Sequence, residues 1–474
     1  MSARNVVVVG YGMAGARLAD EIRRRDPKAE RVRLTVLGAE QHPAYNRVLL
    51  SSVVAGGMNP DTVRLHDAEW AGRSQVDLHL GVTVTRLDPA QRLVQTSTGE
   101  FSYDSLVLAT GATPWLPPVE GLEPGPEVVT FRTLDDCARI LDAARPGAPV
   151  VVLGGGLLGL EAARGLAGRG ANVTVVHPYS HLLERQLDSG AGRVLARQLA
   201  DLGVTFRFEV TAARHLPGDG LKLDDGSFVP ADLVVVAAGV RPEAALAEAA
   251  GLAVDRGVLV DDLLRTSDGR IHALGDCAVH PGAPAGLVQP AWEQAAVLAD
   301  LLTGTDTGAR YRGTRAVTRL KARDIDLAAL GETHVSIEDE SAEIITFDDP
   351  AGGRYGKLVV RGERVTGAIL LGLPDAAAMV TQLHDRGIPV PDDRLAVLLG
   401  RALPAGAPTA ASPADLPSSA LICRCNAVTK GRLIEAWRGG AADAAALART
   451  TRATTGCGSC RDTVDAVAEW LAAQ

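Results

Sequence analysis

Four of the six cysteines in this chain of 474 residues lie within its last 52 residues. They form two close pairs, Cys423-x-Cys425 and Cys457-x-x-Cys460, which are separated by 31 residues. Four thiolates brought together can hold a 2Fe-2S cluster or a tetrahedral zinc ion. Structural zinc sites usually place two to four residues between the cysteines of each pair, so the single-residue spacer of the first pair counts against zinc. The spacing therefore favours a 2Fe-2S cluster, with a zinc site and a cysteine set without metal as the alternatives.

A glycine pattern of the form G-x-G-x-x-G occurs twice, about 144 residues apart. Each copy follows an apolar run and precedes a helical pattern and a second apolar run. The first glycine permits a tight turn, the second lets a pyrophosphate approach the backbone, and the third lets helix and strand pack closely. The helix N-terminus supplies amide donors for the phosphates. The two copies therefore predict two dinucleotide-binding units. Their glycines are Gly10, Gly12 and Gly15, and Gly154, Gly156 and Gly159.

Three further apolar runs, 106–111, 233–239 and 271–276, end in small residues. Such endings are typical of strands whose backbone passes close to a ligand. They add five candidate cofactor-binding residues: Thr110, Gly111, Gly239, Gly275 and Asp276.

The composition narrows the class of protein. The chain has 48 Lys and Arg against 57 Asp and Glu, a formal charge of −9, which argues against a nucleic-acid partner. No apolar stretch reaches the roughly 18 residues that a membrane span needs. The apolar run after the N-terminus is too short for a signal peptide. We therefore expect a soluble, cytoplasmic protein, in which clustered cysteines serve metal or redox chemistry.

The order of these motifs resembles the two-dinucleotide-binding-domain flavoprotein reductases, in which the first glycine motif holds FAD and the second holds NAD(P)H. The resemblance implies an α/β fold with two Rossmann-like domains, a small α+β domain and a C-terminal helical module. It also implies that Asp276 hydrogen-bonds the ribityl chain of FAD, and that the FAD-binding domain is interrupted by the NAD(P)-binding domain.

The domain boundaries follow from these patterns and from composition. Alternating apolar residues in 342–347, 357–361 and 366–371 predict antiparallel strands, and 379–386 predicts a helix. A segment rich in Pro, Ala and Ser predicts a tether. The predicted units are an FAD-binding domain at 1–115 and 245–310, an NAD(P)-binding domain at 116–244, a small α+β domain at 311–401, a linker at 402–420 and the cysteine module at 421–474.

The residue after the second strand of each unit bears on nucleotide recognition. In the first unit Glu40 is expected to accept hydrogen bonds from the adenosine ribose. In the second unit the corresponding place holds His177, where an NADH-selective enzyme usually has Glu or Asp. A protonated His177, helped by His181 or Arg185, would favour a 2′-phosphate. The sequence leaves the choice between NADH and NADPH open.

The segment Tyr45-Asn46-Arg47 is similar to one in the flavin-NAD(P)H portion of assimilatory nitrite reductases and in the reductase subunits of assimilatory nitrate reductases. The resemblance implies that Arg47 contacts FAD and that Glu161 lies near nicotinamide and flavin as a candidate catalytic residue. Ser52 stands where those reductases often have a lysine. The motif around Lys321 also resembles this group, and the sequence gives this lysine no role.

Residues 421–474 resemble the bacterioferritin-associated-ferredoxin-like 2Fe-2S domain, which implies a cluster held by the four clustered cysteines. Thr429 is predicted to cap a helix, and Cys460 is predicted to start a second one with apolar residues at helical spacing. The other two cysteines, Cys137 and Cys277, are predicted to be small buried hydrophobic residues. No redox pair is then expected beside the flavin, which argues against a disulfide reductase.

These observations predict an NAD(P)H-dependent flavoprotein that passes electrons through FAD and a 2Fe-2S cluster to a separate terminal reductase. Assimilatory nitrate reductase is the first expectation and a separate nitrite reductase the next. The chain ends at Gln474 before any sirohaem domain, so we expect that it does not reduce nitrite alone. The alternatives are an amino-acid or opine dehydrogenase subunit, which needs no second nucleotide motif, and a non-catalytic nucleotide-binding redox or zinc sensor. A homodimer is a candidate assembly, and the oligomeric state is left open.

Overall fold

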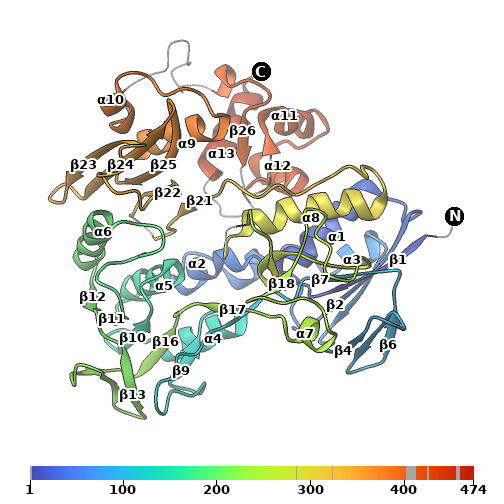
Figure 1. Cartoon of the computed structure of the whole chain (residues 1–474), viewed down its shortest axis with the longest axis horizontal. Coiled ribbons are helices and arrows are strands. Elements are labelled where there is room, and N and C mark those ends of the chain that lie inside the picture. The colour runs from blue at the N-terminus through green and yellow to red at the C-terminus, as the bar shows by residue number, and fades with distance from the viewer. Residues whose placement is uncertain are drawn as a thin grey trace.

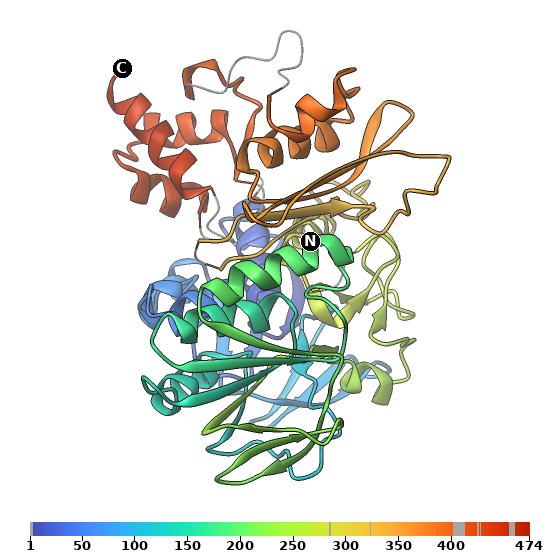
Figure 2. The ribbon, with the colours of Figure 1, turned by 90° about the vertical axis from the view of Figure 1, so that its left-hand side faces the viewer.

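The computed structural model describes residues 3–283, 286–322, 324–401, 413–423, 426, 428–454 and 460–474. Two α/β units lie side by side, and the C-terminal part of the chain forms a layer over them (Figure 1). Figure 2 shows the same division from a second side, with the orange and red elements above the blue and green ones. Within the described ranges, no helix has the length and apolar character needed to cross a membrane.

The first unit is built on a parallel sheet with the strand order β19-β7-β1-β2-β3. Its central strands are runs of buried valine and leucine, as expected for a parallel sheet that is covered on both faces. Helix α1 (Met13–Arg25) follows β1 and packs beside α8 (Val288–Thr303). The strands are β1 (Arg4–Val9), β2 (Val32–Gly38), β3 (Val76–Leu80), β7 (Ser105–Leu108) and β19 (Ile271–Ala273).

The second unit repeats this plan with the parallel order β12-β11-β10-β16-β9. Each unit also carries a three-stranded antiparallel sheet, so the internal repeat extends beyond the glycine motifs. The main strands are β9 (Val128–Thr130), β10 (Pro149–Leu153), β11 (Asn172–His177), β12 (Val204–Phe208) and β16 (Leu233–Val236), with helices α4 (Leu134–Ala143), α5 (Leu157–Ala167) and α6 (Ser189–Asp201). The antiparallel sheets are β4 (Val84–Asp88), β5 (Leu93–Thr96) and β6 (Glu100–Ser102), and β13 (Ala212–Leu216), β14 (Gly220–Leu223) and β15 (Phe228–Pro230).

The chain crosses between the two units through an antiparallel ribbon of β8 (Ala112–Pro114) and β17 (Val240–Pro242). The last strand of the first sheet, β19, follows the whole second unit in the sequence. The second sheet is therefore inserted between strands of the first. Short elements complete the two units: η1 (Arg47–Leu49), α2 (Leu50–Val54), η2 (Pro60–Val63), α3 (Trp70–Arg73), α7 (Ala245–Ala249), β18 (Val258–Leu259), η3 (Gly275–Cys277) and β20 (Ala278–Val279).

An antiparallel sheet of order β21-β22-β25-β24-β23 forms the small third unit. Alternate residues of its strands face opposite sides. Ala328 and Leu370 belong to a core with α9, whereas Ala329 and Ile369 share a core with the second unit. The predicted strands are confirmed, and the predicted helix begins earlier, at Pro374. The elements are β21 (Val317–Arg319), β22 (Leu327–Gly331), β23 (Glu343–Asp349), β24 (Arg354–Arg361), β25 (Arg364–Leu371), α9 (Pro374–Arg386) and α10 (Arg394–Leu398).

The C-terminal module is a small helical bundle. Thr429 accepts from the backbone N–H of Arg432 at 3.3 Å and caps α11, as predicted. Lys430 Nζ donates to the carbonyls of Ala414 and Leu416, so residues 413–420 lie against the module. Residues 402–412 of the predicted linker lie outside the described residues. The elements are η4 (Pro413–Asp415), β26 (Leu421–Cys423), β27 (Val428–Thr429), α11 (Lys430–Arg438), α12 (Ala444–Thr451) and α13 (Arg461–Ala472).

Candidate functional site

The first glycine loop joins β1 to α1. Gly10 has φ +111°, and a Cβ there would lie 2.2 Å from the carbonyl oxygen of Ala109. A Cβ at Gly15 would lie 2.0 Å from the carbonyl oxygen of Gly10. At Gly12, by contrast, the nearest atoms belong to the Arg47 guanidinium at 3.9 Å. The first and third glycines are therefore required for packing, while the second lies open on the side from which a phosphate can approach.

The second glycine loop has the same geometry. A Cβ at Gly154 would lie 2.5 Å from the Ala237 carbonyl oxygen, and one at Gly159 would lie 2.1 Å from the Gly154 carbonyl oxygen. Gly156 has no described atom within 4 Å of its Cβ position. This arrangement fits a second dinucleotide.

The helix starts at these loops have no side-chain cap. Gly12 and Gly156 are the N-cap residues of α1 and α5, and neither helix has a side-chain cap hydrogen bond or an acidic first turn. Helices α4 and α6 are instead capped by Thr133 and Asp188. The amides at the start of α1 and α5 therefore face outward as donors, which is the arrangement that binds phosphate.

A carboxylate and an arginine meet beyond the end of β2. Arg47 forms an ion pair with Glu40, and the Tyr45 hydroxyl donates to Glu40 over 2.7 Å. Arg47 also donates to the backbone oxygen of Arg132 at 3.2 Å. The structure thus brings two predicted residues, Glu40 and Arg47, together beside the first glycine loop.

Arg132 belongs to this site although no motif in the sequence includes it. It lies between β9 and α4 of the second unit, and its guanidinium pairs with Asp276 at 2.7 Å. The N–H of Gly275, which has φ +76°, donates to the buried Gln294 side chain at 2.9 Å. Arg132 therefore links Asp276 to Arg47 across the boundary between the two units.

The other predicted residues of the first site lie where the chain crosses between units. The Thr110 hydroxyl donates to the carbonyl of Glu243 at 2.7 Å, and Gly111 accepts from the backbone N–H of Glu243 at 2.9 Å. Gly239, with φ +122°, accepts from the backbone N–H of Trp115. These contacts fix the two segments that connect the first and second units, next to both glycine loops.

His177 is buried at the end of β11, with 3% of its surface exposed. Its Nδ1 accepts from the backbone N–H of Gly155 at 3.0 Å, so its Nε2 carries the proton that is donated to the carbonyl of His181 at 3.0 Å. Both ring nitrogens of His177 therefore form hydrogen bonds to the backbone of this chain. The nearby Arg185 side chain is 83% exposed, and its Nε lies 3.7 Å from Oε1 of Glu184.

Glu161 lies on α5 at a junction of three units. Its Oε1 accepts from the backbone N–H of Lys321 at 3.0 Å, and the Lys321 ammonium donates to the carbonyl of Val48 at 3.3 Å. Val48 and Ser52 lie four residues apart in consecutive helical turns, on one face. Lys321 therefore brings a cation from the third unit close to the segment that contains Ser52.

Two of the four clustered cysteines can be placed. Cys423 and Cys460 are both buried, and a hydrogen bond from the Cys460 thiol, opposed by burial, lowers the pKa of Cys423 to about 6. The thiolate is the form that binds metal, and a lowered pKa favours that form, so the donor chemistry fits a metal centre. Cys425 and Cys457 lie outside the described residues.

The remaining two cysteines are buried as predicted. Cys137 is 1% exposed and Cys277 is fully buried. Burial raises the pKa of Cys137 to about 12 and also raises the pKa of Cys277. Both thiols are therefore protonated and unreactive at neutral pH.

Three family models match the chain. One described as pyridine nucleotide-disulphide oxidoreductase matches residues 4–297. The rubredoxin NAD+ reductase C-terminal domain matches residues 317–382, and the BFD-like [2Fe-2S] binding domain matches residues 421–470. These matches confirm the predicted FAD, NAD(P)H and 2Fe-2S cofactors.

Curated relatives match nearly the whole chain. A nitrite reductase [NAD(P)H] of Bacillus subtilis (strain 168) is 35% identical over 98% of this chain and 58% of its own length. The assimilatory nitrate reductase electron transfer subunit of the same organism is 34% identical over 99% of this chain and 60% of its own length. The chain thus spans about three fifths of the length of these relatives.

Solved structures share the fold. The covalent putidaredoxin reductase–putidaredoxin complex aligns with a TM-score of 0.74 and 26% identity, covering 83% of this chain and 96% of the other. A NAD-dependent persulfide reductase from A. fulgidus has a TM-score of 0.74 and 27% identity, covering 93% and 84%. The predicted α/β fold class is confirmed.

Proposed function

The chain belongs to the pyridine nucleotide-disulphide oxidoreductase family, and from that premise we propose that it passes electrons from NAD(P)H through FAD and a 2Fe-2S cluster to a separate terminal reductase. The observation that carries this proposal is the place of the cysteine module, which lies against α1, the helix that starts at the first glycine loop. In this proposal the exit for electrons lies next to the domain that binds the flavin. The proposed compartment is the cytoplasm, where cysteines stay reduced.

In this proposal the first unit binds FAD and the second binds NAD(P)H. The FAD-binding domain is 1–115 and 245–310, the NAD(P)-binding domain 116–244, the small domain 311–401, and the cluster module 421–474 after the linker 402–420. FAD is held by Gly10, Gly12, Gly15, Glu40, Arg47, Thr110, Gly111, Gly275 and Asp276, and we add Arg132. NAD(P)H is held by Gly154, Gly156, Gly159 and Gly239, with His177 supporting the loop. The cluster is held by Cys423, Cys425, Cys457 and Cys460.

When bound, FAD would supply a centre that takes the two electrons of a hydride together and gives them up one at a time. The protein aligns the nicotinamide with the flavin and excludes water from between them. Glu161 is proposed to lie at this meeting point, where the Lys321 backbone N–H fixes its carboxylate. Arg47 pairs with Glu40 and Arg132 pairs with Asp276, so the two guanidinium groups orient the two carboxylates that are proposed to bind FAD.

Assimilatory nitrate reductase is the terminal reductase that we propose first, because a relative over 99% of this chain is named as its electron transfer subunit. A nitrite reductase is the second candidate, since relatives with that name match equally well. The two complete glycine loops weigh against an amino-acid or opine dehydrogenase, which oxidises an organic substrate and needs no second nucleotide. They do not by themselves separate an enzyme from a sensor, so turnover must be measured.

The test is anaerobic purification followed by absorption spectra before and after addition of NADH or NADPH. We expect flavin and cluster bands that bleach with one of the two nucleotides, and then reoxidation by a nitrate or nitrite reductase. A protein with flavin but no iron or acid-labile sulfide would contradict the cluster. Reduced protein that transfers no electrons to either reductase would contradict the proposed partners, and absence of dye reduction would favour the sensor.

A further inference from the structure

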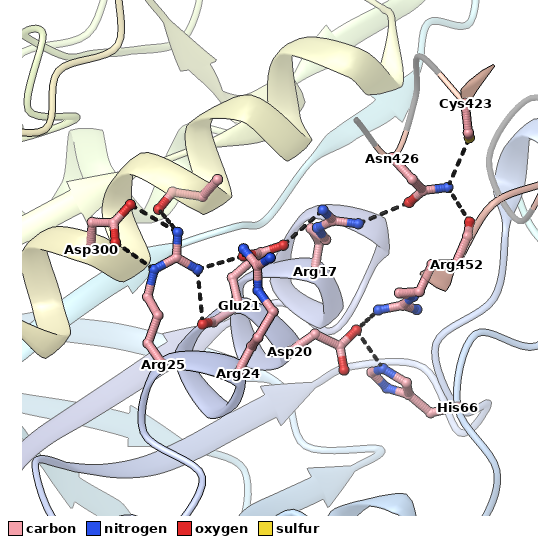
Figure 3. A network of polar contacts seen from close by, with 11 residues as sticks. Arg17, Asp20, Glu21, Arg24, Arg25, His66, Asp300, Cys423, Asn426 and Arg452 are labelled. Carbon is pink, nitrogen blue, oxygen red and sulfur yellow. Dashed lines mark hydrogen bonds and ion pairs between the residues drawn. The ribbon is translucent and has the colours of Figure 1, made fainter. Parts of the chain in front are cut away.

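Helix α1 carries polar side chains that join the C-terminal module to the first unit (Figure 3). Arg17 donates to the side-chain oxygen of Asn426 at 2.8 Å. One turn further along the helix, Asp20 pairs with Arg452 of the module. Two side chains of α1 therefore dock the module.

Arg17 is oriented by its own unit. One guanidinium nitrogen pairs with Glu21 at 2.7 Å, and the guanidinium lies 5.3 Å from the ring centroid of Trp292. The Arg17 side chain is 12% exposed and the Glu21 side chain is 4% exposed. Because Glu21 and Trp292 already fix the guanidinium, its other terminal nitrogen is directed at Asn426 with little further loss of side-chain entropy.

Asp20 is oriented in the same way. Its carboxylate lies 3.0 Å from Nε2 of His66, whose other ring nitrogen contacts the hydroxyl of Tyr11 in the first glycine loop. Burial lowers the pKa of His66 to about 3, so the ring is neutral at physiological pH. The negative charge of Asp20 is therefore balanced by Arg452 of the module.

The side chain of Asn426 has a determined orientation. The residue is 5% exposed. An arginine can only donate hydrogen bonds, so the amide oxygen must be the end that faces Arg17. The amide nitrogen then faces the module, where it donates to the backbone oxygen of Arg452 and to the sulfur of Cys423 at 3.6 Å. Arg17 at the oxygen end and the Arg452 carbonyl at the nitrogen end thus together determine which end of the amide meets the sulfur.

We propose that Arg17 and Asn426 couple docking of the module to the one-electron midpoint potential of its cluster. The inference rests on the proposed role of Cys423 as a cluster ligand. Hydrogen bonds to ligand sulfur are one of the means by which a protein tunes a cluster, and they stabilise the more negative, reduced form. Docking holds the Asn426 N–H toward the sulfur, and separation from α1 releases that constraint. The docked module is therefore the better acceptor of one electron from the flavin.

The test is a redox titration of the cluster in the full chain, followed by EPR spectroscopy. R17M removes the donor that holds the oxygen end of Asn426, and N426A removes the hydrogen bond to sulfur. At a fixed applied potential, each variant is expected to have a ratio of reduced to oxidised cluster that is lower by about twofold to tenfold. This range corresponds to the free energy of one hydrogen bond. The double variant R17M/N426A is expected to match N426A, because both changes remove the same hydrogen bond.

R24M is the matched control. Arg24 lies on the same helix and binds the same Glu21, but its side chain is 51% exposed, so R24M should leave the ratio unchanged. R17K keeps a donor and should restore the wild-type ratio at least in part. If R17M is not recovered folded, R17L gives the same comparison, because leucine also has no donor.

Two outcomes separate this inference from the proposed function. Equal midpoint potentials in wild type, R17M and N426A, with full cluster content in all three, would overturn the coupling while leaving the cluster in place. Absence of iron and acid-labile sulfide from the wild-type protein would overturn the cluster itself.

Discussion

At the residue scale, Glu161 combines a structural contact with a proposed place in the reaction. Its carboxylate is the acceptor for a backbone N–H of the third unit, and the residue is 7% exposed. A buried N–H without an acceptor costs about 1–3 kcal/mol. The charge of Glu161 and its hydrogen-bonding capacity can therefore be tested separately.

E161Q keeps an oxygen that can accept from Lys321 and removes only the charge. We expect near-wild-type thermal stability and a rate of NAD(P)H-dependent dye reduction lowered by about tenfold or more, the scale of a lost charge interaction with reacting groups. E161A leaves the Lys321 N–H unpaired and should also lose about 1–3 kcal/mol of stability. Thermal melts and steady-state kinetics measure the two effects. An E161Q variant with wild-type rates would show that the carboxylate charge has no part in hydride transfer.

Two buried histidines predict how stability depends on pH. Burial lowers the pKa of His66 to about 3 and that of His272 to about 4, each from an ordinary value of 6.5. Below about pH 6.5 the unfolded chain therefore binds more protons than the folded chain. The free energy of unfolding is highest above that pH and decreases as the pH falls toward the pKa values of the folded state.

We expect each of these histidines to cost about 1 kcal/mol of stability between about pH 7 and about pH 5.5. H66Q removes the titrating group and should flatten the pH dependence over this range. Denaturant unfolding at several pH values measures the slope, and equal slopes in H66Q and wild type would contradict the prediction.

Residues in local motifs could be predicted, and residues defined by distant partners could not. The glycines, Glu40 and Arg47 follow from short segments. Arg132 pairs with a residue 144 positions away, and Asn426 meets a side chain 409 positions away. No local spacing signals such contacts, because the fold alone brings these segments together.

At the element scale, the two glycine loops allow a matched pair of substitutions. Gly156 has open space around its Cβ position, whereas a Cβ at Gly159 would clash with the Gly154 carbonyl oxygen. G156A should therefore fold with nearly unchanged stability but raise the KM for NAD(P)H by about tenfold or more, because the methyl group lies where the pyrophosphate approaches. G159A should lose several kcal/mol of stability, since a backbone atom must move. An unchanged KM for NAD(P)H in a folded G156A variant would show that the nucleotide does not bind at this loop.

Periodicity predicted the elements well, and their limits less well. Successive residues in the strands of the third unit face two different cores, as the alternating sequence pattern indicates. Helix α9 begins five residues before the predicted start, at Pro374, a residue that is favoured in the first turn. Residues 413–420 have the composition of a tether, yet Leu416 packs on the module, since tertiary contacts with Lys430 outweigh composition.

At the scale of the whole molecule, the insertion of one sheet between strands of another explains how distant motifs form one site. Arg132 of the second unit reaches Asp276 of the first, and Lys321 of the third unit reaches Glu161 of the second. The module adds contacts to α1. Each proposed transfer of electrons therefore takes place at a boundary between units.

The module should depend on its cluster more than the rest of the chain does. The segment 421–474 is close to the size at which a domain needs a bound inorganic centre. Two of its core residues, Cys423 and Cys460, are proposed ligands, and removing the cluster removes their crosslink. Anaerobic removal of iron by a chelator should therefore unfold α11–α13 and leave the two parallel sheets folded.

Hydrogen–deuterium exchange measures this prediction, because protection is read separately in each segment. After chelation we expect fast exchange in 428–451 and 461–472 and unchanged protection in the strands β1 and β10. C423S, which removes a proposed ligand, should give the chelated pattern without a chelator, while C137S, at a buried cysteine outside the module, should not. Full protection of α11–α13 in iron-free protein would contradict the dependence, since the apolar core and the contacts to α1 would then suffice to keep the module folded.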